Sequence, residues 1–201
     1  MDHKKIITLA LSAITLFGAQ RLEAQSVGLS LNLGTYAAKQ ENSSGIAVDT
    51  KGSLYQSAAL HTEFPLGKGV LPLSFGVDQF SSRMDANAVQ SVTADANTIK
   101  MGTGYTRLFA DPQSKKQPFL GLGIDAEVFN HAKFRYTDEQ QGNLLWKNNV
   151  YINACAGVRF SRGDVHFDVF AKYAIGTRNR ISQGVYTDQT FTIGTRMLIQ
   201  P

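Results

Sequence analysis

Three stretches in the second half of the chain alternate strictly between apolar residues and residues of mixed polarity. In 120–128, 150–160 and 165–175 every second residue is Leu, Ile, Val, Ala, Phe or Tyr. Successive side chains of a β-strand point to opposite faces, so the alternation predicts strands with one wholly apolar face. The other face carries charges of both signs. Such a sheet fits a lipid-facing surface, and a closed barrel in an outer membrane is the usual way to build one.

Residues 1–24 have the layout of a secretory signal peptide. A short charged start precedes an apolar stretch over 6–17, and Ala24 provides a small residue before the expected cleavage point. The apolar stretch is too short to span a bilayer. We expect an exported chain, 25–201, that forms a single barrel domain; the alternative is that 1–24 form an N-terminal core helix.

Charge and cysteine content argue against several classes of function. Cleavage would remove three basic and two acidic residues, which lowers the net charge from +4 to +3. A charge so small and dispersed does not predict nucleic-acid binding. Cys155 is the one cysteine, so no internal disulfide can form and a structural zinc site is not expected. We expect no cofactor and no metal site.

The alternation predicts an all-β fold, an eight-stranded antiparallel up-and-down transmembrane β-barrel. The expected strands are 27–36, 53–64, 70–80, 98–109, 120–128, 150–160, 165–175 and 190–199. The second and fourth are the least regular, because Gln56 and Arg107 interrupt their apolar faces. Pro72 lies near the start of the third strand, where a missing backbone donor is tolerated.

The predicted connections alternate in length. Short, turn-like connections are expected at 65–69, 110–118 and 161–164. Long connections, rich in Asn, Gln, Ser and Asp, are expected at 37–52, 81–97, 130–149 and 176–189. Short periplasmic turns opposite long outer loops are typical of outer-membrane barrels. An even strand count also brings both ends of the barrel domain to the periplasmic side.

The inward face of the predicted barrel holds five acidic and four basic residues. They are Glu63, Asp78, Lys100, Asp125, Glu127, Arg159, Asp168, Lys172 and Arg196. Side chains can fill an eight-stranded barrel, and an unpaired buried charge costs several kcal/mol. We therefore expect these nine residues to form a salt-bridge cluster that plugs the lumen, with glycines making room for the longer side chains. A conducting pore is the alternative.

Two histidines leave an enzymatic alternative open. His61 with Glu63, and His166 with Asp168, lie two residues apart on the inward face. Ordinary lumen pairs have the same spacing, and a general base needs its partner within hydrogen-bond reach. We expect no catalytic activity; the alternative is an outer-membrane lipid-modifying enzyme with His61 or His166 as base.

A secreted lipocalin-like binder is the competing fold. It would need an apolar interior and a polar exterior, the reverse of the pattern above. It would also normally carry Gly-x-Trp near its first strand, whereas Trp146, the one tryptophan, lies in a predicted loop. No small-molecule substrate is evident.

Aromatic residues gather at the predicted strand ends. They are Tyr36, Phe64, Phe80, Phe109, Phe119, Phe129, Trp146 and Phe160. We interpret them as girdles at the two membrane interfaces. The alternative is that aromatic residues simply favour strands.

The layout resembles small outer-membrane barrels of the OmpX and OmpA-domain kind over the whole of 25–201. Three motifs resemble the TraO proteins of Bacteroides-type conjugative transposons. They are Gly104-Tyr105-x-x-Leu108-Phe109-x-Asp111-Pro112, Leu120-Gly121-Leu122-Gly123, and Phe191-x-Ile193-Gly194 through Met197-Leu198-Ile199. The resemblance implies a non-catalytic envelope component of a conjugative transfer apparatus in the bacterial outer membrane. Its expected partners are outer-membrane lipid and other transfer proteins; a general role in envelope integrity or adhesion is the alternative.

Overall fold

The computed structural model describes residues 26–41, 47–49, 53–85, 91–111, 114–136, 141–144, 148–180 and 184–200. The predicted signal peptide and Trp146 lie outside these ranges. Within them, no helix is long and apolar enough to cross a membrane.

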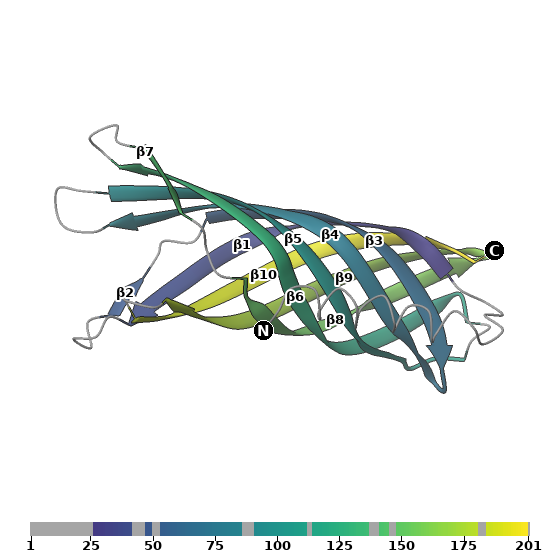
Figure 1. Ribbon diagram of the computed structural model, residues 1–201. Coiled ribbons are helices and arrows are strands. Elements are labelled where there is room, and N and C mark those ends of the chain that lie inside the picture. Colours follow the sequence, from purple (N-terminus) through teal and green to yellow (C-terminus); the bar gives the residue numbers. More distant parts are fainter. Residues whose placement is uncertain are drawn as a thin grey trace.

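The described chain forms ten strands in one sheet (Figure 1). They are β1 (Ser26–Glu41), β2 (Ala47–Asp49), β3 (Ser53–Leu66), β4 (Gly69–Asp85), β5 (Ser91–Leu108), β6 (Lys116–Tyr136), β7 (Gln141–Leu144), β8 (Val150–Arg162), β9 (Val165–Arg180) and β10 (Gly184–Ile199). All except β2 and β7 are staves of a barrel, each antiparallel to its neighbours, and β10 pairs with β1 to close it. The predicted fold class is confirmed.

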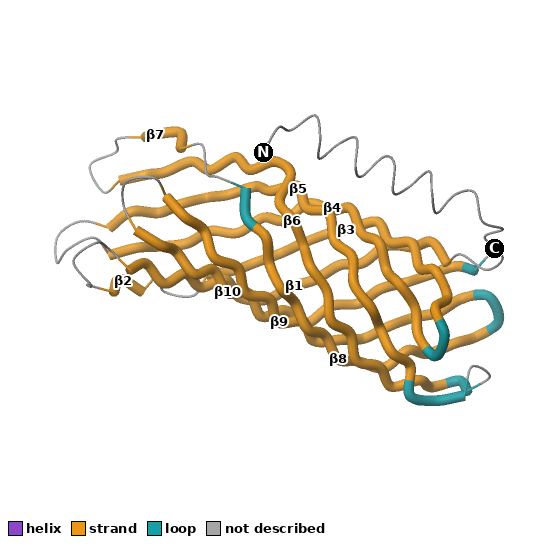
Figure 2. Tube along the Cα trace, turned by 60° about the horizontal axis from the view of Figure 1, so that its bottom comes forward, coloured by secondary structure: helices purple, strands orange, loops and turns teal. Residues whose placement is uncertain are grey.

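Closure of the barrel displaces the pairing register along the strands. Followed from strand to strand around the barrel, the paired residues are Gly28, His61, Ser74, Gly102, Asp125, Tyr151, Gly176, Asp188 and finally Ala38. The path therefore returns to β1 ten residues beyond its start. Such a displacement tilts the strands against the barrel axis, as Figure 2 shows.

The apolar faces predicted from the sequence lie on the outside of the barrel. Leu33, Leu122, Ile152 and Ile193 are each between 58% and 70% exposed. The residues between them point inward, and Asp168 and Arg159 are buried there. A continuous exposed apolar belt around a polar interior is the architecture of bacterial outer-membrane barrels. The protein is therefore a small β-barrel of the bacterial outer membrane.

The barrel has two unlike ends. At one end, which we call the turn end, the strands are joined by the short connections 67–68, 109–115 and 163–164, shown in Figure 2. The first and third begin with Gly67 and Gly163 at φ of 60° and 58°, a left-handed conformation that two-residue hairpin turns require and glycine adopts without strain. Short turns of outer-membrane barrels face the periplasm. The strands that begin and end the described barrel, β1 and β10, also reach this end.

At the other end the expectation of long loops is largely wrong. Six strands continue well past the apolar belt: β1, β4, β5, β6, β9 and β10. The short strands β2 and β7 pair with the ends of β1 and β6. Polar side chains end the apolar alternation because the strand leaves lipid for water. The backbone pairing has no reason to stop there, so the strand continues.

A β-bulge on β6 explains where its sequence pattern ends. Ile99 pairs with Phe129 and Lys100 with Glu127, so Val128 is the extra residue. Both Val128 and Phe129 face outward, and the inward sequence resumes at Asn130, which is buried. The alternation over 120–128 therefore stops at the bulge although the strand does not.

The belt predicts how a charge on the outer face should act. Leu122→Arg places a cation near the middle of the belt and should lower the free energy of unfolding in lipid vesicles by about 2–4 kcal/mol. Leu66→Arg, at the turn end, is the control and should cost only about 0–1 kcal/mol. Urea titration followed by Trp146 fluorescence measures both. If the free energies of unfolding of both variants stay within about 0.5 kcal/mol of wild type, the outer face of the barrel is an ordinary water-exposed surface.

Candidate functional site in the barrel lumen

Two arginines and two carboxylates form a closed cluster in the lumen near the turn end. Arg159 Nε lies 2.8 Å from Asp168 Oδ1, and Arg159 Nη2 lies 2.8 Å from Glu63 Oε2. Arg196 Nη2 lies 2.5 Å from Asp168 Oδ2 and 3.2 Å from Glu63 Oε1. All four residues are buried, Asp168 completely. The formal charges balance, and each carboxylate is shared by two guanidinium groups.

The register of three neighbouring strands brings this arginine cluster together. Asp168 on β9 is the cross-strand partner of Arg159 on β8 and of Arg196 on β10. Glu63 comes from β3, on the far side of β1. The cluster therefore ties the last three strands to the first part of the chain across the lumen.

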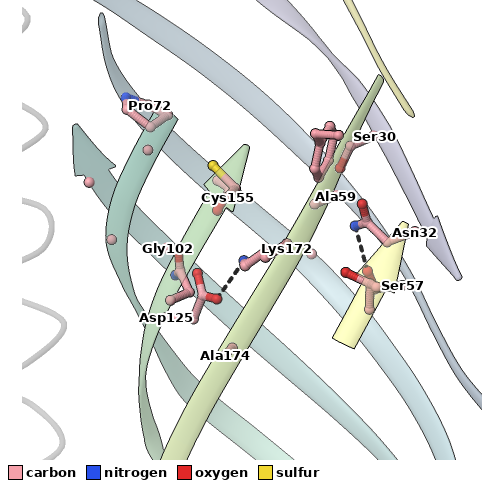
Figure 3. Close-up of a pocket in the computed structure, with 18 of the residues that line it drawn as sticks. Ser30, Asn32, Ser57, Ala59, Pro72, Gly102, Asp125, Cys155, Lys172 and Ala174 are labelled. Carbon is pink, nitrogen blue, oxygen red and sulfur yellow. Dashed lines mark hydrogen bonds and ion pairs between the residues drawn. The ribbon is translucent and has the colours of Figure 1, made fainter. Parts of the chain in front are cut away.

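A chamber of about 110 Å³, with many polar residues in its lining, adjoins this cluster at Arg196 on the side away from the turn end. Figure 3 shows residues that line the chamber. Its lining contains the ion pair between Lys172 Nζ and Asp125 Oδ2 at 2.6 Å. Asn32 Nδ2 donates to Ser57 Oγ at 2.7 Å on another part of the wall. The Lys172 side chain is 30% exposed, against 4% for that of Arg159, so this pair borders open space. A polar chamber of this size has room for several water molecules.

Tyrosines and carboxylates close the chamber on the side away from the turn end. Lys100 Nζ lies 2.6 Å from Asp78 Oδ2, and the Tyr55 hydroxyl donates to the same oxygen at 2.5 Å. The Lys100 ammonium also lies 4.1 Å from the centre of the Tyr151 ring. Tyr151 in turn donates to Glu127 Oε1 at 2.9 Å. This layer relies on tyrosine hydroxyls as much as on opposite charges.

Asp188 belongs to this tyrosine layer although the sequence reasoning missed it. The hydroxyl of Tyr36 donates to its Oδ1 at 2.9 Å, and its Oδ2 lies 3.2 Å from the hydroxyl of Tyr151, whose one proton it shares with Glu127. Asp188 is 1% exposed. The sequence predicts a loop at 176–189, whereas β10 begins at Gly184 in the structure. Thr190 and Thr192 are inward positions, and Asp188 is the next position of the same parity towards the N-terminus. Continuing the alternation by two residues would therefore have identified it.

Three of the aromatic residues assigned to interface girdles point into the barrel instead. Tyr36, Phe80 and Phe119 are at most 2% exposed. The Tyr36 and Phe80 rings stack at 4.1 Å between centroids. Their positions share the parity of the inward residues, and parity decides the side on which a strand residue lies. Phe109, Phe129 and Phe160 do lie on the outer surface, as the girdle interpretation requires.

Glycine provides the space that the charged side chains need. A Cβ atom on Gly102 would collide with Oδ1 of Asp125 and lie 2.6 Å from Oγ of Ser74. Gly102 is the cross-strand partner of both residues. The Lys172–Asp125 pair therefore fits because the neighbouring strand has no side chain there.

Neither histidine meets the carboxylate two residues away. His61 Nε2 lies 2.7 Å from Ser30 Oγ, and His166 Nδ1 lies 2.9 Å from Ser161 Oγ. Glu63 and Asp168, the expected acid partners, are held by the arginine cluster instead. In the described part of the chain, no group of three or more His, Cys, Asp and Glu residues is placed to hold a metal ion.

The comparisons with known proteins do not assign the chain to a family. No family model and no curated protein matches the chain. Several solved outer-membrane structures resemble it. Neisserial surface protein A is 16% identical, with 84% of this chain and 95% of that one covered and a TM-score of 0.43. Ail of Yersinia pestis is 14% identical, covering 87% and 99%, with a TM-score of 0.42. OprG of Pseudomonas aeruginosa is 12% identical, covering 90% and 100%, with a TM-score of 0.46. Similarity at this level carries no information on ligand or partner.

The arginine cluster predicts a large penalty for removing one of its members. Arg159→Met leaves two buried carboxylates with a single arginine and should lower the free energy of unfolding by about 3–5 kcal/mol. Lys172→Met, in the half-exposed pair, should cost about 1 kcal/mol or less. Urea unfolding in lipid vesicles compares the two. Similar small losses in both variants would show that the lumen is hydrated throughout.

The arginine cluster on one side of the chamber and the tyrosine layer on the other also predict that the Cys155 thiol is protected. Cys155 faces the lumen beside Gly121 and Lys172. A charged thiol reagent should leave it unmodified in the folded barrel and modify it fully in urea. A Cys155→Ser/Asp164→Cys variant is the positive control, since Asp164 is exposed at the turn end. Rapid labelling of Cys155 in the folded protein would mean that the lumen is open.

Proposed function

We propose that this protein is a sealed, non-catalytic platform in the outer membrane that binds a partner at the cell envelope through its protruding strands. The observation that carries the proposal is the contrast between a lumen closed by paired charges and strands that continue beyond the lipid belt. The first feature argues against transport, and the second provides a surface outside the membrane.

The lumen has two closed layers in series. The arginine cluster closes it near the turn end, and the layer of Tyr36, Tyr55, Tyr151 and Phe80 closes it on the other side of the chamber. A passing ion would have to separate charges that are paired and buried, which is costly in a low-dielectric interior. The structure divides the nine residues predicted from the sequence between the arginine cluster, the Lys172–Asp125 pair and the tyrosine layer, and in this proposal the three groups together serve as a plug.

The protruding part is a sheet with free edges. β5 pairs with β4 as far as Asp85↔Ser91 and with β6 as far as Val92↔Tyr136. β7 then adds to β6, and among the described strands it has no second neighbour. The unpaired backbone groups of such an edge can pair with an extended segment of another protein. This mode of binding needs no particular side chain.

We further propose that the partner is a protein of a conjugative transfer apparatus. The support is the set of TraO-like motifs at 104–112, 120–123 and 191–199. A role in adhesion or envelope integrity is the second candidate, because the same free edges would serve it equally. Ser30 and Ser161 each lie within hydrogen-bond distance of a histidine, but an enzymatic role is not favoured, because no acidic residue among those described is hydrogen-bonded to either histidine to orient it.

Two measurements test the proposal. The protein in planar bilayers should give no stable large conductance, since both layers block the lumen.

Deleting its gene from a conjugative donor strain should lower transfer frequency at least about tenfold, the effect of losing one interaction of about 1.4 kcal/mol. Wild-type complementation should restore transfer. Complementation with Gly142→Pro, which disturbs β7 without touching the barrel, should not. Unchanged transfer in the deletion strain would remove the conjugation proposal, and steady conductance would remove the plug.

A further inference from the structure

Five exposed cations gather at the turn end of the barrel. They are Lys68, Arg107, Lys115, Lys116 and Arg162. None of them forms an ion pair with a residue that the structure describes. Asp111 and Asp164 are the two exposed acids among the described residues of this end. The other acids nearby, Glu63 and Asp168, are buried in the lumen with the arginine cluster.

The five cations form a continuous arc on one side of the barrel, which we call the basic arc. The Leu108 amide donates to the Lys68 carbonyl at 3.2 Å, which joins the β3–β4 turn to the end of β5. The Ser161 amide donates to the Lys115 carbonyl at 3.0 Å, which joins the β5–β6 connection to the end of β8. On the opposite side, where β1 and β10 reach the turn end, the described residues at the strand ends include no cation.

Three members of the basic arc leave the barrel through its outer wall. Arg107, Lys116 and Arg162 are exposed, and each adjoins a residue on the inward face. These inward neighbours are Thr106, Gln117 and Ser161. By parity the three cationic side chains therefore start on the lipid-facing side of the wall, and Arg107 also borders the cavity at the turn-end mouth of the lumen.

Exposed apolar side chains accompany the cations at the same level. Leu66 and Phe109 are 53% and 55% exposed, and Phe160 on β8 is exposed as well. The Arg107 guanidinium lies 5.7 Å from the centre of the Phe109 ring. Long cationic side chains with aromatic neighbours are typical of the boundary between hydrocarbon and headgroups, where the stem stays in lipid and the charge reaches water.

We propose that the basic arc binds anionic phospholipid headgroups of the phosphatidylglycerol type, and so gathers these lipids on the β3-to-β9 side of the barrel. Guanidinium and ammonium groups bind phosphate oxygens strongly, and an excess of three positive charges attracts an anionic surface. A soluble acidic protein would reach the turn tips at Lys68 and Lys115. It would not reach the three cations that emerge from the wall beside Phe109 and Phe160. The proposal does not depend on the partner proposed above.

Lipid selectivity of the complete barrel tests the proposal. The protein is reconstituted in phosphatidylcholine vesicles that contain traces of spin-labelled phosphatidylglycerol or phosphatidylcholine. Electron paramagnetic resonance then gives the relative association of each lipid with the barrel. We expect roughly threefold preference for phosphatidylglycerol at about 0.01 M salt, and none at about 1 M, where charges are screened beyond about 3 Å. Equal association of both lipids at low salt would overturn the proposal.

Charge variants locate the effect. The triple variant Arg107→Gln/Lys116→Gln/Arg162→Gln should lose most of the preference. The matched control Arg83→Gln/Lys133→Gln/Arg135→Gln removes the same charge from the other end and should keep it. Equal loss in both variants would show a response to net charge alone and overturn the proposal.

Two further measurements keep the test decisive. The double variant Asp111→Asn/Asp164→Asn leaves all five cations in place and should strengthen the preference for phosphatidylglycerol. An unchanged preference would contradict lipid binding by the basic arc. Glycerol phosphate in solution, compared with chloride at equal ionic strength, should not displace the lipid. Complete displacement would show a site for free phosphate instead of a lipid surface.

Discussion

Inside a bilayer the backbone has no water with which to form hydrogen bonds, so every strand needs a partner on both sides. The pairing of β1 with β10 meets this requirement, because it leaves no free sheet edge at the level of the apolar belt. Closure with eight staves then fixes how narrow the interior is. The inward residues must be small, or paired, or both. The glycines, the arginine cluster and the tyrosine layer are all responses to this one constraint.

Outside the lipid the same requirement is relaxed. Among the described strands, β2 and β7 each have one neighbour, and water can satisfy the remaining edge, so the sheet can open where the belt ends. The molecule thus combines a closed, charge-filled cylinder in the membrane with an open sheet beyond it. The two ends also differ in what they can contact. One has backbone edges for a protein segment, whereas the turn end has cations and aromatic rings at the membrane surface.

Alternation in the sequence was sufficient to predict the barrel, its eight staves and the side on which each residue of 27–33 or 191–199 lies, because parity is a local property. It was also sufficient to place Arg159, Asp168 and Arg196 on the inward face. That Arg159 would also meet Glu63 was not predictable, since this contact depends on register between strands 96 positions apart in sequence. The long loops were wrong because polarity marks the end of lipid and not the end of a strand. Asp188 was missed for the same reason, whereas Tyr36 was assigned to a girdle against the parity of its own strand.

The register of the arginine cluster also bears on the order of folding events. Glu63 comes from β3 and its partners from β8 and β10, with 96 residues between Glu63 and Arg159. Until the last strands arrive, the Glu63 carboxylate has neither of its two arginines to meet, and a partly inserted sheet would expose it, together with an open edge, to lipid. Contacts so distant in sequence form slowly. A stepwise, strand-by-strand entry into the membrane would therefore be penalised at every stage, which favours assembly of the whole cylinder before or during its insertion.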